Sequence, residues 1–216
     1  MPSRFPPATL GLIVANVIFF LFQQMGGNEW LLVHFALWPW GPAEPVMTSH
    51  GVVAIGFSVW QLVTYAFLHG SIAHIFFNMF ALFIFGVAVE RALGIRRFLL
   101  YYFVCVITAA LTHLLVARFI TGGFYPTIGA SGGIFGVLLA FGMMFPRTRI
   151  YLWFLLPMPA WVFVAGYGVL ELVLGATGAQ AGVAHFAHLG GMIGGIVLML
   201  YWLGKLPLKP KRPLIP

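Results

Sequence analysis

Residues 98–117 read FLLYYFVCVITAALTHLLVA, a run without a single Lys, Arg, Asp or Glu. As a helix rising about 1.5 Å per residue, this run is about as long as a bilayer's hydrocarbon core is thick, roughly 30 Å. Of all 216 residues, 62% are hydrophobic and only 7% are charged. A soluble domain of this size cannot bury so much apolar surface, so the sequence indicates a membrane protein.

Five further apolar runs surround this segment, and together the six runs define the predicted fold. We predict an all-α membrane protein, a six-transmembrane-helix bundle forming one domain over residues 1–204. A long outer loop at about 23–60, rich in Trp and Pro, is expected to hold short interfacial helices, and the basic tail 205–216 is expected to be disordered. The other five runs cover about 10–22, 67–89, 131–145, 150–174 and 183–203.

The Lys and Arg residues mark one side of this bundle. All eleven except Arg118 lie at the N-terminus, after the second run, after the fourth run or in the tail. In a six-span protein these four places share one side, the asymmetry that the positive-inside rule describes. We therefore expect a multi-pass protein with both termini in the cytoplasm, and we attribute the net charge of +7 to orientation in the lipid bilayer rather than to nucleic acid. The short termini favour a prokaryotic plasma membrane.

The fourth run is short and begins at Ser131. Its span 131–145 makes a helix of roughly 22 Å, so Ser131 is predicted to lie below the outer surface. Ser131 stands between Gly129-Ala130 and Gly132-Gly133. Glycine allows a close approach of other backbones, and first-turn N–H groups are free to bind an oxyanion. Ser131 is a candidate nucleophile, although a serine among glycines is also typical of helix packing.

A serine nucleophile needs a base, and the sixth run offers one. His185 and His188 stand at its start, at the same predicted depth as Ser131. The fourth and sixth runs carry small residues four apart, which favours close packing of the two helices. These small residues are Gly132 and Gly136 in one run and Gly191 and Gly195 in the other. Such packing brings Ser131 and His188 together, and plain helix packing accounts for the same glycines.

The second run supplies polar donors. His74 and Asn78 are four residues apart and share a helix face. Their side chains are suited to an oxyanion hole or, equally on spacing alone, to a polar clasp between helices.

The acidic residues restrict the chemistry further. The chain has no Asp, which excludes an aspartyl protease, and the H-E-x-x-H motif of zinc proteases is absent. Glu90 lies near the inner face, and nothing singles out Glu171. We expect a Ser–His dyad without a third carboxylate, and no metal or cofactor.

In combination, these motifs resemble the rhomboid family of intramembrane serine proteases over about residues 10–204. Residues 69–78 are similar to the family's H-x4-H-x3-N helix, and Glu90 and Gly94 fit its E-x3-G element. Residues 129–132 match G-x-S-G, and residues 187–195 match A-H-x-x-G-x3-G. The resemblance implies an endopeptidase that cleaves transmembrane segments of membrane proteins.

The resemblance also implies roles for single residues. Ser131 is then the nucleophile, His188 the base, and the Ser131 N–H shares the oxyanion hole with two side chains. Those two side chains are His74 and Asn78. The resemblance also implies Gly129, Gly132 and Phe135 as supporting residues, with Phe135 packed against the catalytic histidine.

One departure and two alternatives accompany this interpretation. The family usually carries Trp-Arg before its second span, where this chain has Trp60-Gln61. The alternatives are a catalytically inactive relative that binds membrane proteins, and a transporter that uses His69, His74 and His188 as a metal or proton path. Neither alternative accounts for the serine motif together with its histidine.

Overall fold

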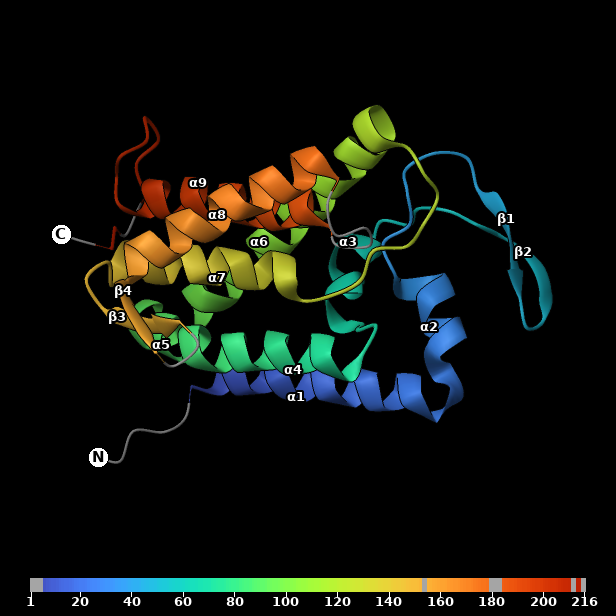
Figure 1. Ribbon diagram of the computed structural model, residues 1–216, viewed down its shortest axis with the longest axis horizontal. Helices are drawn as coiled ribbons and strands as arrows, with labels where there is room; N and C mark the ends of the chain where they lie inside the picture. Colours follow the sequence, from blue (N-terminus) through green and yellow to red (C-terminus); the bar gives the residue numbers. More distant parts are fainter. Residues whose placement is uncertain (1–5, 153–154, 179–183, 211–212, 215–216) are drawn as a thin grey trace.

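The computed structural model describes residues 6–152, 155–178, 184–210 and 213–214, which form a bundle of apolar helices with two β-hairpins. Figure 1 shows the N-terminus and the C-terminus at the same end of this bundle. The main helices are α1 (Pro7–Phe22), α4 (Ile72–Ala81), α5 (Val87–Leu93), α6 (Ile95–Val116), α7 (Ser131–Met144), α8 (Ala160–Thr177) and α9 (His185–Trp202).

Within the described residues, five helical stretches are long and apolar enough to cross a membrane, which confirms the predicted helical membrane bundle. They are Pro7–Phe35, Ile72–Leu93, Ile95–Thr121, Ala160–Thr177 and His185–Trp202. The first stretch bends, because Met25 and Gly26 leave helical geometry before α2 (Asn28–Phe35). Helix α7, with 14 residues, is shorter than each of these five stretches, and a sixth span at α7 stays a prediction.

The loop expected at about 23–60 contains a hairpin that the sequence did not predict. Helix α2 lies within residues 23–60, where short helices were expected, and the short α3 (Gln61–Thr64) begins directly after them. Between these two helices, β1 (Glu44–Thr48) pairs with β2 (Gly51–Ile55). The pairing of Thr48 with Gly51 leaves a two-residue turn, and Gly51 has a φ of +106° that favours glycine. The β-branched residues of β2 then favour a strand.

A second hairpin corrects the predicted start of the fifth span. The fifth run was expected to span about residues 150–174, with Pro157 and Pro159 kinking it or delaying its start. In the structure β3 (Arg149–Leu152) pairs with β4 (Leu156–Pro159), and α8 begins only at Ala160. Pro157 and Pro159 have no backbone N–H to donate inside a helix, so the helix starts after them.

Gln61 stands where the resembled family usually has an arginine, and it connects two parts of the chain that lie before and after the first hairpin. Its side chain is buried, and its Oε1 accepts hydrogen bonds from the backbone N–H groups of Trp38 and Ser58, both at 3.2 Å. The neutral side chain of Gln61 therefore joins the start of α3 to the segment that follows α2.

Glycines bring α9 against α6 and α7, as the spacing of small residues predicted for α7 and α9. A Cβ on Gly191 would overlap the carbonyl oxygen of Gly132, and one on Gly194 would overlap the side chain of Thr108 in α6. The second predicted glycine of α9, Gly195, instead faces Tyr101 of α6. Contact this close fixes the register between the helices that carry Ser131 and His188.

At the start of the bundle, Glu90 of α5 binds the first turn of α1. Its two carboxylate oxygens accept hydrogen bonds from the backbone N–H of Ala8 at 3.0 Å, the N–H of Thr9 at 2.6 Å and the Thr9 hydroxyl at 2.7 Å. These N–H groups belong to the first turn of α1, where no intrahelical partner exists and a negative charge is favourable.

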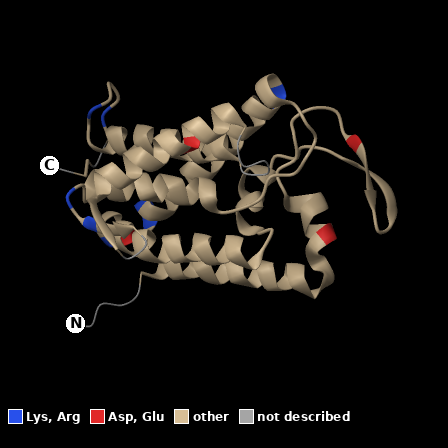
Figure 2. Ribbon diagram, in the orientation of Figure 1, with Lys and Arg blue, Asp and Glu red and all other residues tan. Residues whose placement is uncertain are grey.

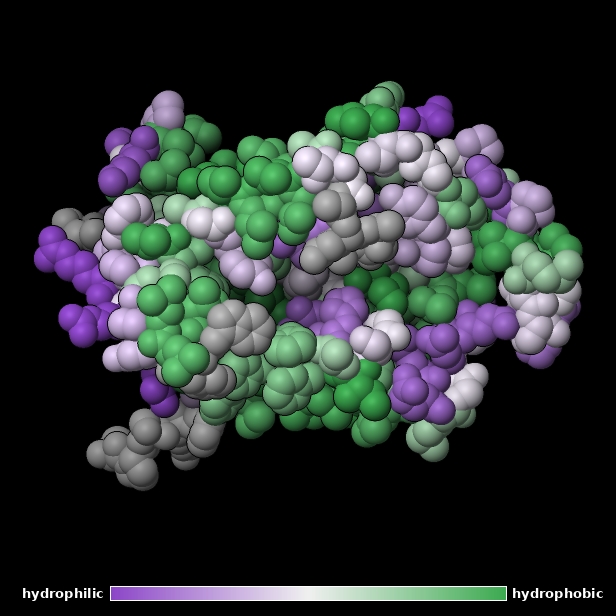
Figure 3. All heavy atoms as spheres, viewed as in Figure 1, coloured by the Kyte–Doolittle hydropathy of each residue, from purple (hydrophilic) through white to green (hydrophobic). Residues whose placement is uncertain are grey.

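Charge and hydropathy divide the molecule along its long axis. Figure 2 shows nearly all of the described Lys and Arg residues gathered at the end that holds both termini. Arg118 instead lies in η4 (Ala117–Thr121), which follows the C-terminal end of α6. Figure 3 shows apolar side chains over much of the middle of the visible face and polar ones toward its ends. In the tail, the N–H of Leu214 donates to the carbonyl of Trp202 at 3.0 Å. The disorder expected for residues 205–216 stays a prediction.

Candidate active site

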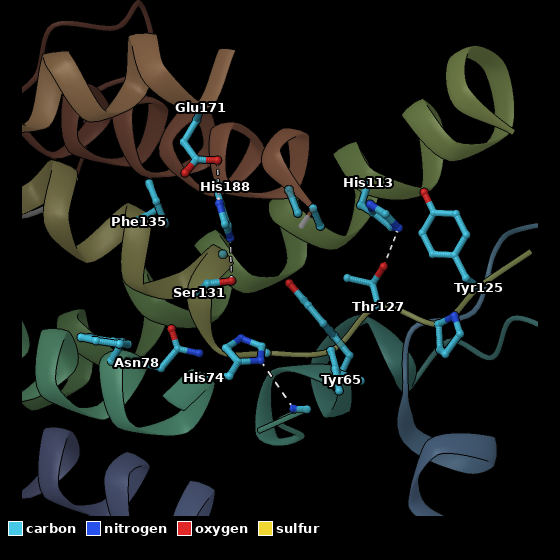
Figure 4. Close-up of a pocket in the computed structure, with 18 of the residues that line it drawn as sticks. Tyr65, His74, Asn78, His113, Tyr125, Thr127, Ser131, Phe135, Glu171 and His188 are labelled. Carbon is cyan, nitrogen blue, oxygen red and sulfur yellow. Dashed lines mark hydrogen bonds and ion pairs between the residues drawn. The ribbon is translucent and has the colours of Figure 1, made fainter. Parts of the chain in front are cut away.

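A cavity of about 630 Å³ lies between α4, α7, α8 and α9 and holds the candidate residues from the sequence (Figure 4). It brings together side chains that are more than one hundred residues apart in the chain. Those of direct interest are His74, Asn78, Ser131, Phe135, Glu171 and His188.

Ser131 is placed by a turn at the start of α7. Gly129 has a φ of +126°, and its N–H donates to the carbonyl of Tyr65 at 2.9 Å. Upstream, the hydroxyl of Thr127 lies 2.6 Å from Nε2 of His113, which fastens the preceding loop to α6. Ser131 is therefore the first residue of α7, with a backbone N–H that precedes the hydrogen-bond ladder of the helix.

His188 lies directly beside Ser131. Its Nε2 is 2.8 Å from the Ser131 Oγ, and the two residues are 57 positions apart in the sequence. The ring of Phe135 stacks on the His188 ring with centroids 4.2 Å apart and planes 6° from parallel. This stacking leaves the imidazole little freedom to rotate, so its Nε2 stays directed at Ser131.

Glu171 of α8 contacts the other side of His188, and this corrects the expectation of a base without a carboxylate. Its Oε2 lies 2.8 Å from Nδ1 of His188 and 2.7 Å from Nδ1 of His185, and all three side chains are buried. A carboxylate can only accept, so Nδ1 of His188 donates and Nε2 is left to accept the Ser131 proton. Ser131, His188 and Glu171 thus lie in line (Figure 4).

The signal for Glu171 was present in the sequence. It is the only Asp or Glu after Glu90, and it stands inside an apolar run. A carboxylate at membrane depth needs a hydrogen-bonding or charged partner, and the nearby histidines are the partners that the structure supplies.

His74 and Asn78 project from α4 into the same cavity. The N–H of Gly70 reaches Nδ1 of His74 at 3.5 Å, so a neutral ring carries its hydrogen on Nε2. This Nε2 atom lies beside Gly129, because a Cβ added to Gly129 would come within 2.8 Å of the His74 Nε2. Figure 4 shows both side chains on the side of Ser131 away from His188.

His69 supports Asn78 from behind. Its Nε2 lies 3.0 Å from the Asn78 side-chain nitrogen, so the amide nitrogen donates to a neutral ring. His69 precedes α4, and burial, together with the neighbouring His74, lowers its pKa to about 3. The histidine therefore stays neutral and keeps accepting over the ordinary pH range, which fixes the orientation of the Asn78 amide.

Gly132 and Tyr65 shape the wall of the cavity. A Cβ on Gly132 would overlap Ala109 of α6 and come within 3.2 Å of the Tyr65 hydroxyl. That hydroxyl donates to the carbonyl of Val106 at 2.9 Å. Burial raises the pKa of Tyr65, so the phenol keeps its proton. Gly132 thus serves close packing beside Ser131.

Glu171, His185 and His188 also form a possible metal-ligand group. Their ligand atoms all lie within 4.8 Å of one another, and the group combines two imidazoles with one carboxylate. This donor set suits zinc and related transition metals.

Comparisons with known proteins agree with the motifs. A family model described as the Rhomboid domain matches residues 56–205. The chain is 34% identical over 181 residues to Rhomboid protease GluP of Bacillus subtilis (strain 168), covering 83% of this chain and 31% of that protein. It is 33% identical over 147 residues to the mitochondrial Rhomboid protein 1 of Saccharomyces cerevisiae, covering 65% and 41%.

A human relative extends the match along the chain. The mitochondrial presenilin-associated rhomboid-like protein of Homo sapiens is 27% identical over 209 residues, covering 95% of this chain and 50% of that protein. The chain therefore spans between about a third and half of the length of these relatives.

Proposed function

Since this chain belongs to the rhomboid family, we propose that it is a serine endopeptidase that cleaves transmembrane segments of other membrane proteins. The observation that carries the proposal is the 2.8 Å contact between Ser131 Oγ and His188 Nε2 at the wall of a cavity. A nucleophile in hydrogen-bonding contact with an oriented base is the arrangement that acyl transfer requires.

The first chemical step is attack by Ser131 on a peptide carbonyl. The Ser131 hydroxyl proton passes to Nε2 of His188 as the Oγ–carbon bond forms, giving a tetrahedral intermediate and an imidazolium ring. Glu171 accepts from Nδ1 of this ring, at 2.8 Å, and stabilises its positive charge. Stacked Phe135 holds the ring in place while the proton moves.

Three donors are available for the oxyanion of that intermediate. The Ser131 N–H stands at the start of α7, and His74 and Asn78 line the same cavity from α4. His74 offers Nε2–H because its Nδ1 accepts from Gly70. Donors already aligned before the reaction stabilise developing charge without reorganising.

The remaining steps release the two products. His188 protonates the leaving amine, the peptide bond breaks, and the first product departs. Water in the cavity then attacks the acyl-enzyme, with His188 again taking the proton, and Ser131 is regenerated.

The substrate is proposed to reach this cavity between α4 and α8. Phe77 of α4 and Tyr167 of α8 both line the cavity and are also exposed, at 61% and 37% respectively. An unwound stretch of a transmembrane segment can therefore pass from lipid into the cavity between these two helices.

The orientation of the protein in its membrane is part of the proposal. The gathering of Lys and Arg at the end with both termini supports cytoplasmic termini and an active site near the outer face. We assign the protein to a prokaryotic plasma membrane, and detection of a tagged chain in another membrane fraction would contradict that assignment.

Labelling with a fluorophosphonate probe tests the catalytic pair. The wild-type protein should be labelled, whereas Ser131→Ala and His188→Ala should not be, and Ser58→Ala serves as a control serine outside the cavity. Cleavage of a model single-span substrate in liposomes should follow the same pattern. Equal labelling of wild type and Ser131→Ala would refute the proposal.

A further inference from the structure

One carboxylate oxygen next to the proposed base faces two imidazoles at once. Oε2 of Glu171 lies 2.7 Å from Nδ1 of His185 and 2.8 Å from Nδ1 of His188. A serine hydrolase needs only the second of these contacts to orient its base. His185 does not line the cavity that holds Ser131, so the proposed reaction leaves its contact with Glu171 without a role.

The three groups have the chemistry of a zinc site. Two neutral imidazole nitrogens and one carboxylate are a donor set that binds zinc with a fourth position left open. Tetrahedral ligands about 2.0–2.1 Å from the ion lie about 3.3 Å apart. The two contacts of Oε2, at 2.7 and 2.8 Å, must therefore widen by about half an ångström. All three ligand atoms already lie within 4.8 Å of one another, so rotations of the side chains bring them to this spacing.

An ion can reach this place from the cavity. Glu171 and His188 both line the cavity, and all three side chains come from just two neighbouring helices, α8 and α9. The positions of His185 and His188, three residues apart at the start of α9, direct both rings to the same side of the helix.

We propose that Glu171, His185 and His188 form an inhibitory site for Zn²⁺. This inference rests on the proposed serine protease function. Zinc bound at Nδ1 of His188 moves the ring hydrogen from Nδ1 to Nε2, and the ring stays neutral. Nε2 is then a donor toward Ser131 and cannot take the serine proton, so the nucleophile is no longer activated.

Inhibition is measured on the purified full chain with the fluorophosphonate probe and buffered Zn²⁺. Saturating Zn²⁺ should lower the labelling rate of the wild type at least tenfold, and EDTA should restore it. His185→Gln keeps a donor toward Glu171 but removes one zinc ligand. This variant should still be labelled, with its half-inhibiting Zn²⁺ concentration raised at least tenfold.

A matched control separates this site from the other histidines. His34→Gln removes an imidazole in α2 outside the cavity and should respond to Zn²⁺ as the wild type does. If His185→Gln is inhibited at the same Zn²⁺ concentration as wild type, the inference is wrong.

Binding is measured separately from activity with Co²⁺, which replaces Zn²⁺ and absorbs visible light when tetrahedral. Ser131→Ala should develop this absorption, and the double variant Ser131→Ala/His185→Gln should lose it. If the wild type is labelled at the same rate with and without Zn²⁺, and no Co²⁺ absorption develops, this inference is wrong and the proposed function stands. Co²⁺ absorption without any labelling of the wild type overturns the proposed function, and with it the inhibitory role.

Discussion

Among single side chains, Glu171 offers the sharpest test of how the base is oriented. Glu171→Gln removes the charge that stabilises the His188 imidazolium and allows the wrong tautomer. In a comparable triad, loss of the acid's charge lowers kcat by about 10⁴-fold. We expect a loss in kcat of about 10²- to 10⁴-fold with KM little changed, measured by cleavage in liposomes.

A conservative variant distinguishes orientation from folding. Glu171→Asp keeps the charge and should recover part of the lost kcat. Were Glu171→Gln to cleave at the wild-type rate across the pH range, Glu171 would be a structural residue only.

A substitution of Asn78 tests whether the proposed oxyanion donors contribute to catalysis. Asn78→Ala removes one donor aligned by His69, and a lost donor of this kind costs about 10²-fold or more in kcat. The thermal unfolding midpoint should be measured alongside cleavage, because a variant that unfolds early would lose activity for a different reason. Unchanged kcat in a folded Asn78→Ala protein would remove Asn78 from the proposed mechanism.

The low pKa of His69 predicts that the stability of the protein depends on pH. Its folded-state pKa is about 3, against an ordinary value of 6.5. Between these values the unfolded chain binds a proton that the folded protein does not, so the free energy of unfolding falls as pH falls from about 6.5 toward 3. His69→Gln should weaken this dependence, as measured by unfolding midpoints at pH 7.5 and 5. A gap between the two proteins that does not change with pH would contradict the assignment.

At the scale of helices, the contact of Gly191 with Gly132 predicts a strong effect of a single methyl group. Gly191→Ala forces α9 away from α7 and should destabilise the protein by about 1–3 kcal/mol, with loss of probe labelling. Gly166→Ala in α8 is the matched control, because a Cβ there meets nothing within 4 Å. The control should be as stable as wild type or slightly more so. Equal unfolding midpoints for the two variants would mean that the close approach is unimportant.

The sequence predicted some elements well and others poorly, for identifiable reasons. The positions of the Lys and Arg residues and the spacing of the glycines together predicted that Ser131 and His188 meet. The charges indicated which helix ends lie on the same side of the membrane, and the glycines indicated which helix faces pack together. Glu171 was missed because α8 is apolar on all sides, so its pattern does not reveal which face meets α9. The first hairpin was missed because short apolar runs beside prolines also suit interfacial helices. The second was missed because Ile150, Tyr151 and Leu152 continue the apolar run of α8, so the sequence assigned them to the fifth span.

For the whole molecule, the basic end predicts which parts are reachable from each side of the membrane. The native Cys105 is fully buried, so new cysteines can be labelled without background. In right-side-out vesicles, an impermeant maleimide should label Ser49→Cys at the β1–β2 turn. Leu208→Cys in the tail, exposed at 77%, should react only after permeabilisation. The reverse pattern would invert the proposed topology.

The position of Glu171 on α8 has a consequence for the way the molecule works as a whole. Helix α8 faces outward along much of its length, with Trp161, Val169 and Leu172 each more than half exposed. Ser131 and His188 stand on α7 and α9, which glycines lock together, whereas the acid stands on this peripheral helix. Because Glu171 stands on α8, an outward displacement of α8 would separate its carboxylate from His188. Under the proposed function, the passage between α4 and α8 and the orientation of the base would then depend on the position of the same helix.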